Sequence, residues 1–134
     1  MNAASIDLKD LILQDSSLGL IFGTNMFVGR EPASPNNTIT LFDAPGASPE
    51  LTYDASSYQY DAVQIRTRSS KYEDGWNLIE KIKEFINGRA NETLNDTFYS
   101  LIIVANGPYH FDWDNNDRAR FIMNVNLQRR KTNG

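Results

Sequence analysis

The 134-residue chain contains no cysteine and only one histidine. The lack of cysteine excludes disulfide frameworks, thiolate zinc sites and thiol nucleophiles. His110 stands between Tyr109 and Phe111 without partner residues at the spacing of a catalytic or metal motif, which favours an ordinary loop histidine. Phosphate-binding GxxxxGK[ST] and dinucleotide-binding GxGxxG motifs are also missing. We therefore expect no catalytic residue, no metal site and no cofactor.

Long apolar runs are missing as well. No stretch approaches the roughly 18 to 20 apolar residues that span a bilayer, and no basic region precedes an apolar run near the N-terminus. We expect neither a membrane span nor a signal peptide. Thirteen basic and seventeen acidic residues give a net charge of −4. Sequence-specific nucleic-acid binding is therefore not expected, although a local basic patch is compatible with this charge. The length suits a single domain over residues 1–134.

The clearest structural signal is the segment from Asp61 to Gly88. Apolar and polar residues alternate over 63–68, which predicts a strand with one buried and one charged face. Ser70 and Glu73 have the spacing of a capping box, which predicts the start of a helix. Apolar residues then recur every three or four positions, and Gly88 suits the left-handed position that ends a helix.

The other segments predict further strands and a short helix. A narrow apolar stripe from Leu8 to Ile12 indicates an N-terminal helix that Ser5 caps and residues 16–19 end. β-prone residues and alternation indicate strands elsewhere. The predicted strands cover residues 25–30, 38–43, 63–68, 97–105 and 120–128.

This order of elements predicts an α+β domain. We expect a single mixed or antiparallel sheet of about five strands, with one long helix packed on one face and a short N-terminal helix. The run 97–105 is apolar on both faces, which suggests the middle of the sheet, and residues 106–108 (Asn-Gly-Pro) should end it. The basic tail from Arg129 to Gly134 should fray.

Two groups of side chains are candidates for contacts with other subunits. The first group consists of arginines that either guard sheet edges or pair with a neighbouring subunit, namely Arg66, Arg68, Arg118 and Arg120. The second group lies in or beside the irregular segment Asp43–Tyr60, whose length is usual for a functional or a disordered loop. Its tyrosines are equally compatible with a packed loop and with an interaction surface, and they are Tyr53, Tyr58 and Tyr60. In contrast to these candidates, seven other aromatic residues lie on apolar periods and are expected in the core. They are Phe22, Phe27, Phe42, Trp76, Phe85, Phe98 and Phe121.

The acidic run from Asp112 to Asp117 is the only segment with a metal-like pattern. Asp112, Asp114 and Asn116 match the first, third and fifth positions of a calcium-binding loop. The sixth position is Asp117 instead of glycine, and the twelfth is Met123 instead of glutamate. This mismatch favours a solvated turn between strands. A metal-dependent hydrolase that uses Asp112, Asp114 and Asp117 is a remote alternative.

Several motifs occur in one order between about Phe27 and Leu127. They are Phe27–Pro32 (FVGREP), Ile39–Gly46, Val63–Arg68 followed by Tyr72-Glu73, Gly107-Pro108, and the turn Asp114–Arg120 leading into Phe121 and Asn124-Val125. In this order and spacing the chain resembles the tail terminator family of tailed bacteriophages, also named phage minor capsid proteins. It departs from the family at Asn115–Arg118, where a glycine-bearing turn is expected, and in its basic C-terminal tail.

The resemblance implies a structural virion protein without enzymatic activity. Terminators of this kind form a hexameric ring on the finished tail tube, halt tube polymerisation and offer a surface to the connector proteins of the head. The implied partners are copies of the protein itself, the major tail tube protein and a head-completion or connector protein, with room for DNA to pass through the ring. The implied location is the head–tail junction of the virion, after assembly in the cytoplasm of the bacterial host.

A ring requires two different and complementary patches on each subunit. One candidate pairing places Arg66 and Arg68 against Asp112, Asp114 and Asp117 of a neighbour. The long segment 43–60 is the candidate for contact with the tube or the connector. Another ring-forming head–tail connector, or a tail tube protein, is the alternative function.

Overall fold

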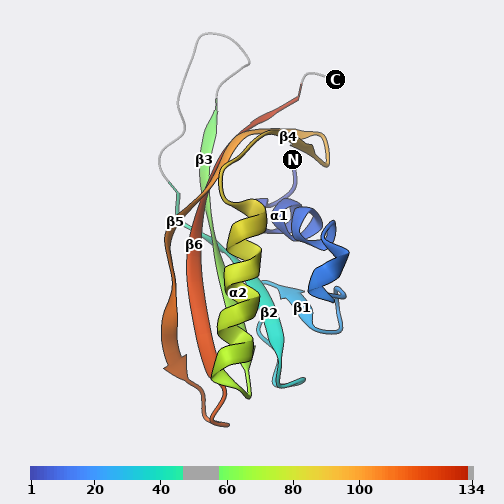
Figure 1. Cartoon of the computed structure of the whole chain (residues 1–134). Helices are drawn as coiled ribbons and strands as arrows, with labels where there is room; N and C mark the ends of the chain where they lie inside the picture. The colour runs from blue at the N-terminus through green and yellow to red at the C-terminus, as the bar shows by residue number, and fades with distance from the viewer. Residues whose placement is uncertain (47–57, 133–134) are drawn as a thin grey trace.

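The computed structural model describes residues 1–46 and 58–132. These residues form one six-stranded sheet with two α-helices (Figure 1). The helices are α1 (Ala4–Leu13) and α2 (Tyr72–Ile86), and a short 3₁₀ turn covers Ser16–Leu18. The strands are β1 (Met26–Val28), β2 (Thr38–Ala44), β3 (Gln59–Ser69), β4 (Arg89–Leu94), β5 (Thr97–Trp113) and β6 (Ala119–Lys131).

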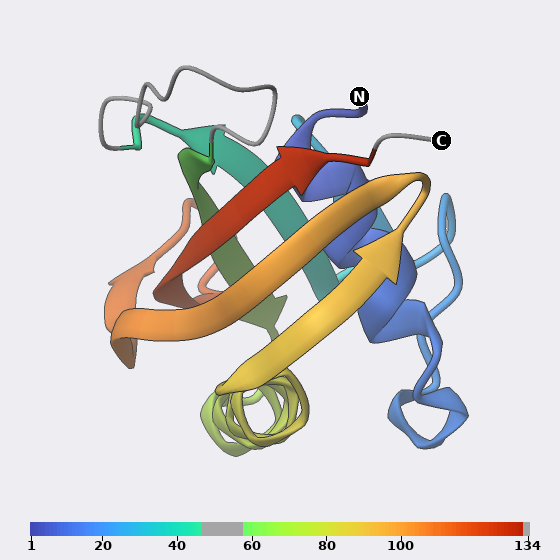
Figure 2. The ribbon, with the colours of Figure 1, turned by 90° about the horizontal axis from the view of Figure 1, so that it is seen from above.

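The strand order is β1-β2-β3-β6-β5-β4, with β1 parallel to β2 and all other pairs antiparallel. Figure 2 shows that this mixed sheet is strongly twisted and curved. The predicted α+β class with one mixed sheet is confirmed, but the count of about five strands is wrong. The missed strand is β4, whose sequence RANETL is mostly polar. It forms by pairing with the β-prone first part of β5, a partner that local propensity does not reveal.

Both helices pack on the same face of the sheet. Gly75 of α2 lies against Phe121 of β6, while Asp7 of α1 lies near Arg129, eight residues further along the same strand. Residues an even number of positions apart on a strand share a face. The core between this face and the helices contains leucines and isoleucines from both helices and alternating residues of the central strands, including Leu8, Leu11, Ile79, Ile82, Ile65, Met123 and Val125. The opposite face carries no helix among the described residues, and we call it the open face.

The N-terminal helix does not begin with the predicted serine cap. Its first flanking residue is Ala3, without a side-chain cap, and Ser5 lies inside the helix. Instead, Asp43 of β2 accepts hydrogen bonds from the Ser5 amide (3.0 Å) and from the Ser5 hydroxyl (2.7 Å). A carboxylate from a distant strand therefore binds a free amide of the first turn, where negative charge is also favoured by the helix dipole.

The predicted capping box of α2 is also wrong. The helix is preceded by Lys71 without a side-chain cap, because the amides before it bind other groups. The Ser70 amide donates to Asn37 Oδ1 (3.1 Å), and the Lys71 amide donates to Ser69 Oγ (3.1 Å). The predicted end is confirmed, since Gly88 follows the helix with φ of +84°.

Strand β5 continues beyond the predicted stop at Asn106-Gly107-Pro108. It follows β6 as far as Trp113 through several register shifts, which are bulges that absorb extra residues. Gly107 has φ of +89°, and a Cβ there would lie 2.8 Å from the Ile122 carbonyl oxygen, so the bulge requires glycine. Pro108 is tolerated because, within the described residues, no strand pairs with the other side of β5 beyond Ile102. That part of β5 is an edge, and only its first part lies inside the sheet.

The expected frayed tail and the expected edge arginines are both wrong. Arg129, Arg130 and Lys131 belong to β6 instead of a frayed tail, and Arg129 is buried. The arginines expected at sheet edges lie on or directly before β3 and β6, which are central strands. Within the described residues, neither α1 nor α2 has the length and the apolar composition of a membrane-spanning helix.

The predicted aromatic core is confirmed for Phe121, which is fully buried. It is wrong for Phe22 and Trp76, which are 51% and 36% exposed. The other four phenylalanines of that prediction are partly buried. The long segment predicted between Asp43 and Tyr60 lies largely outside the described residues, and its two ends belong to β2 and β3.

Candidate functional site

Four arginines gather on the open face near Glu31. Arg68 of β3 lies opposite Arg120 of β6, and Glu31 Oε1 lies 3.4 Å from Arg68 Nη1 and 3.0 Å from Arg120 Nη1. Arg66 Nη1 is 3.8 Å from Glu31 Oε2. Glu31 follows β1, so its carboxylate ties three arginines of two central strands to the loop at the edge of the sheet.

Arg68 and the fourth arginine, Arg118, hold the proline-rich loop that follows Glu31. Arg68 donates to the carbonyl oxygens of Pro32 and Pro35, each at 2.6 Å, and Arg118 donates to that of Ala33 at 2.7 Å. Arg68 is almost completely buried. Burial and the neighbouring Arg118 lower the pKa of Arg68. The guanidinium fork fits several carbonyl oxygens at once, so these arginines fix the loop conformation.

The acidic run supplies partners to the same arginines. Arg120 binds both carboxylate oxygens of Asp112, and this hydrogen bonding lowers the pKa of Asp112 and raises that of Arg120. Asp114 accepts from Arg118 Nε at 2.8 Å. Burial alone would raise the pKa of Asp114, but hydrogen bonds from the Arg118 and Asn116 amides and from the Arg118 side chain lower it. Asp117 is exposed. The predicted turn is present at 114–118, and Asp112 belongs to β5.

Arg66 lies between two aromatic rings on the open face. Its guanidinium carbon is 5.0 Å from the Phe42 ring centre and 5.2 Å from that of Phe111, distances typical of cation–π contacts. Its Nη2 donates to Gln64. Arg66, Arg68, Arg118 and Arg120 therefore have partners in their own chain. Pairing of Arg66 and Arg68 with a neighbouring subunit's aspartates stays a prediction.

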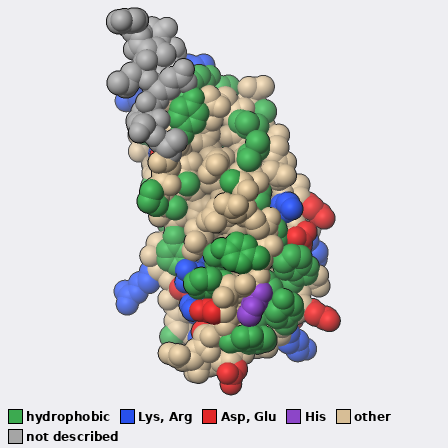
Figure 3. Space-filling model, turned by 90° about the vertical axis from the view of Figure 1, so that its left-hand side faces the viewer, with side chains coloured by type: hydrophobic (Ala, Val, Ile, Leu, Met, Phe, Trp, Pro, Cys, Tyr) green, Lys and Arg blue, Asp and Glu red, His purple; other side chains and the backbone are tan. Residues whose placement is uncertain are grey.

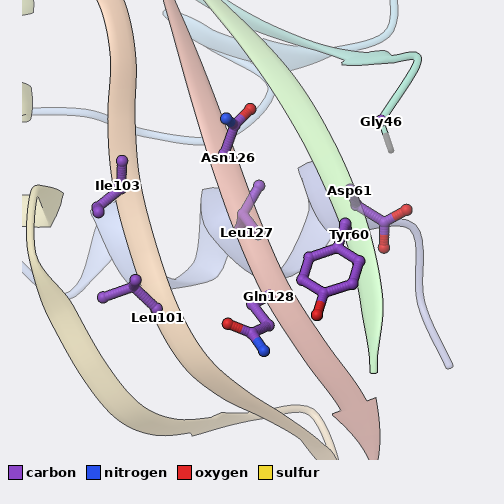
Figure 4. A pocket seen from close by; sticks show the side chains of 8 residues that line it. All are labelled: Gly46, Tyr60, Asp61, Leu101, Ile103, Asn126, Leu127 and Gln128. Atoms are coloured by element: carbon purple, nitrogen blue, oxygen red, sulfur yellow. The ribbon is translucent and has the colours of Figure 1, made fainter. Parts of the chain in front are cut away.

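The tyrosine candidates are only partly placed. Tyr53 lies outside the described residues. Tyr58 precedes β3, with the Arg130 guanidinium 5.8 Å from its ring centre. Tyr60 belongs to β3 and lines a shallow hollow of about 280 Å³ on the open face. Figure 4 shows the side chains around this hollow, with Leu101 and Ile103 on β5 across from Tyr60. The walls are mainly apolar and amide groups, and they form no set of groups for acid–base chemistry.

Sequence reasoning missed a group of aromatic side chains beside the N-terminal end of α2. The Tyr72 ring lies 5.3 Å from His110, 6.1 Å from Trp113 and 4.8 Å from Phe121, and Trp76 lies 5.8 Å from Phe121. We call Tyr72, Trp76, His110 and Trp113 the aromatic patch. Figure 3 shows hydrophobic side chains gathered around the histidine near the lower end of the molecule.

The patch is much more exposed than a core cluster. Trp113 is 53% exposed, Tyr72 46% and Trp76 36%. His110 lies on β5 rather than in the predicted loop, and its Nε2 atom is buried without a hydrogen-bond partner among the described residues. The signal in the sequence was weak, because helical spacing links Tyr72 to Trp76 but nothing local links either of them to Trp113.

A second exposed apolar feature lies near the other edge of the sheet. Ile21 and Phe22 are 60% and 51% exposed, and Phe22 bridges to Met26 of β1. We call Ile21 and Phe22 the tip. Neither the patch nor the tip contains the pairs of acids and bases that catalysis requires. Among the residues that the structure describes, no group of three or more acidic or histidine side chains could hold a metal ion.

Residues 12–132 match the model of a family described as bacteriophage tail terminator proteins. The chain belongs to this family. As a tail terminator family member it is a structural protein of the phage virion and not an enzyme, which removes the hydrolase alternative. None of the curated proteins matches the chain.

The fold of this tail terminator family member also occurs in a solved virion. A chain of the virion of a native gene transfer agent particle superposes with a TM-score of 0.70 and 11% sequence identity. The similarity covers 95% of this chain and 94% of that chain. At 11% identity the comparison shows a common fold. It assigns no role to the tip, to the aromatic patch or to the four arginines near Glu31.

Proposed function

We propose that this protein closes the end of the phage tail tube as a ring of identical subunits. In this role it ends tube polymerisation and provides the surface to which the head joins. The family match over residues 12–132 supports a role in the tail. The observation that favours a ring is the exposure of large apolar side chains near two opposite edges of one sheet, at the tip beside β1 and at the aromatic patch beside β5.

A closed ring requires two different and complementary surfaces on each subunit. A ring forms when one surface of each subunit binds a different surface of the next and the rotation closes. A twofold dimer would instead need a single patch that binds itself. Contiguous exposed apolar side chains are typical of interaction sites. We expect a homohexamer with the major tail tube protein on one side, a head-completion or connector protein on the other, and DNA passing through its centre.

Assembly with the tube protein tests this function. The purified tube protein should polymerise without limit on its own, and addition of this protein should give shorter tubes that carry a ring at one end in negative-stain images. Light scattering of the protein without the tube protein should give the mass of a single ring and not of a growing stack. An unlimited stack of this protein alone would indicate a tube protein, and tubes of unchanged length would contradict the terminator role.

The charged pairing between subunits is a second element of this proposal. Arg68 is buried against carbonyl oxygens of its own chain. An Arg68→Glu substitution would therefore disturb the fold of the subunit, and a loss of assembly would not identify an interface. Asp117 is exposed and gives the cleaner test. The Asp117→Asn variant removes the charge and keeps a side chain that suits the positive φ of 57° at this position. It should fold normally and assemble less readily at low salt if Asp117 faces basic side chains of a neighbour. Unchanged assembly would remove Asp117 from the interface.

A further inference from the structure

We propose that the tip of one subunit docks on the aromatic patch of the next subunit. The inference rests on the proposed ring and names the two surfaces that form its repeated contact. The occupant of the aromatic patch is therefore a second copy of this chain. The docking elements are Ile21 and Phe22 on one side, and Tyr72, Trp76 and Trp113 on the other.

The tip is held rigid before any contact forms. The Ile21 amide donates to Asn25 Oδ1 (2.7 Å), and Asn25 Nδ2 donates to the Gly19 carbonyl oxygen (3.1 Å). The Ile21 carbonyl oxygen accepts from the amides of Thr24 (3.0 Å) and Asn25 (3.1 Å). These bonds close a tight turn and leave two large apolar side chains in solvent. A preorganised loop loses little conformational entropy on binding.

The aromatic patch offers the kind of surface that such a tip needs. Tyr72 and Trp76 stand on the first turns of α2, and Trp113 ends β5. Tyr72 packs against His110 and Phe121, Trp76 packs against Phe121, and Trp113 packs against His110. Their positions are therefore fixed by packing although their outer faces are exposed. Tyrosine and tryptophan dominate the central contacts of protein interfaces because they bury a large area with few rotatable bonds.

Charge distribution favours a second copy of the chain as the occupant. Two basic groups lie beside the tip. Lys9 Nζ is 4.5 Å from the Phe22 ring centre, although it also pairs with Asp10. Arg30 lines the same groove as Phe22, and the one acidic residue of that groove, Glu31, is already paired with arginines of β3 and β6. Beside the aromatic patch, the first turn of α2 carries two exposed acidic groups, Glu73 and Asp74, next to one exposed basic residue, Lys71, so the surroundings of the patch carry a net negative charge. Opposite charges around two apolar patches steer them together and fix their orientation.

Geometry excludes the alternative that the two surfaces meet within one subunit. The tip adjoins β1 at one end of the strand order, and Trp113 lies on β5 near the other end, with β2, β3 and β6 between them. Figure 1 shows β1 and the end of β5 on opposite sides of the molecule. Each subunit thus carries one copy of each surface, facing away from each other, as a head-to-tail contact requires.

The absence of cysteine makes a direct test simple. A Thr24→Cys protein is mixed with a Glu73→Cys protein under conditions where rings form, and a short thiol-specific cross-linker is added. Thr24 adjoins the tip and Glu73 adjoins the patch, and both are exposed. The mixture should give cross-linked dimers at least several-fold above either protein alone. The control mixture pairs Glu73→Cys with Thr93→Cys, an exposed position on β4, and should stay at background.

A substitution test measures the contribution of the tip. Phe22→Ser removes a half-exposed ring, so the subunit should keep its circular dichroism spectrum, while subunit association should weaken by about tenfold or more. The matched control is Ile103→Ser, which removes a 40% exposed apolar side chain from the open face and should change association little. Equal effects of the two substitutions would overturn the assignment of the tip.

The outcomes separate this inference from the proposed function. Rings that form normally but give no more Thr24–Glu73 cross-linking than the control would overturn tip-to-patch docking and leave the terminator role intact. A protein that forms no ring, alone or on tail tubes, would contradict the proposed function itself and the docking with it. Cross-linking in the mixture together with weakened association of Phe22→Ser supports both.

Discussion

The hydroxyl group of Tyr99 donates a hydrogen bond of 2.5 Å to Oδ2 of Asp7, and both side chains are fully buried. Arg129 lies beside them, with Nη1 3.2 Å from the Tyr99 oxygen and 3.6 Å from Asp7 Oδ2. Arg129 Nε also binds Asp61 of β3. Burial and the neighbouring Asp7 raise the pKa of Tyr99 above its usual value of 10.0, which keeps the hydroxyl protonated as a donor. The bonds among Asp7, Tyr99 and Arg129 therefore join α1 to strands β5 and β6.

Replacing Tyr99 by phenylalanine should destabilise the protein by about 1 to 3 kcal/mol, because the buried Asp7 carboxylate loses a donor in a site that water does not reach. Urea denaturation followed by circular dichroism measures this difference. The matched control is Tyr109→Phe at a 45% exposed position, which should change the free energy of unfolding by less than about 0.5 kcal/mol. A Tyr99→Phe variant as stable as the control would show that the bond to Asp7 contributes nothing net.

Arg68→Lys should loosen the proline-rich loop although it keeps the charge. A lysine ammonium group is a single point donor and does not reproduce the planar fork that binds the Pro32 and Pro35 carbonyl oxygens together. We expect a loss of about 1.5 to 3 kcal/mol, the usual range for hydrogen bonds to a charged group. Hydrogen exchange should become faster in residues 31–37 and stay unchanged in α2. Unchanged exchange in the loop would contradict this role of Arg68.

Gly75→Ala should destabilise the protein even though alanine is the better helix former. A Cβ at this position would lie 3.0 Å from Cε2 of Phe121 and 3.2 Å from Cβ of Ser69, and Phe121 is fully buried and has little room to move. The propensity gain of about 1 kcal/mol should be outweighed by an overpacking cost of about 1 to 3 kcal/mol. Thermal unfolding measures the net sign. A higher melting temperature would mean that α2 can move away from the sheet.

Asp112→Asn should produce a pH-dependent loss of stability. Hydrogen bonding from Arg120 holds the pKa of Asp112 below its usual value of 3.8. The ionised group therefore stabilises the folded state above that value, and this contribution is lost as the pH falls through the lowered pKa. The variant should be less stable than the native chain at pH 7, by up to about 1 kcal/mol for a pair at the surface. The difference should shrink below about pH 4.

Denaturant midpoints at pH 7, 5 and 3 measure this effect. The control is Asp117→Asn, since Asp117 forms no ion pair among the described residues and its positive φ of 57° suits asparagine. The control should change stability little at any of these pH values. A gap between the native chain and Asp112→Asn that is constant across the pH range would show that the ion pair with Arg120 is not its source.

Elements with a strong period of their own could be predicted from the amino-acid sequence. The alternation over 63–68 and 120–128 and the three-to-four spacing after Ser70 correspond to β3, β6 and α2. Gly88 marked the end of α2, and the order of motifs between Phe27 and Leu127 indicated the family that residues 12–132 match. These signals are local, because a period of two or of 3.6 records which side of one element is buried.

How those elements meet, and which side chains stay exposed, became visible only in the folded chain. Local propensity could not reveal β4, which forms on β5, or the continuation of β5 past Pro108, which depends on that strand becoming an edge. The same holds for Asp7, which is buried through Tyr99, 92 residues away in the sequence. It also holds for the arginine cluster and the aromatic patch. The physical reason is that periodicity specifies a buried face but not its partner, and partners are chosen by contacts between distant segments.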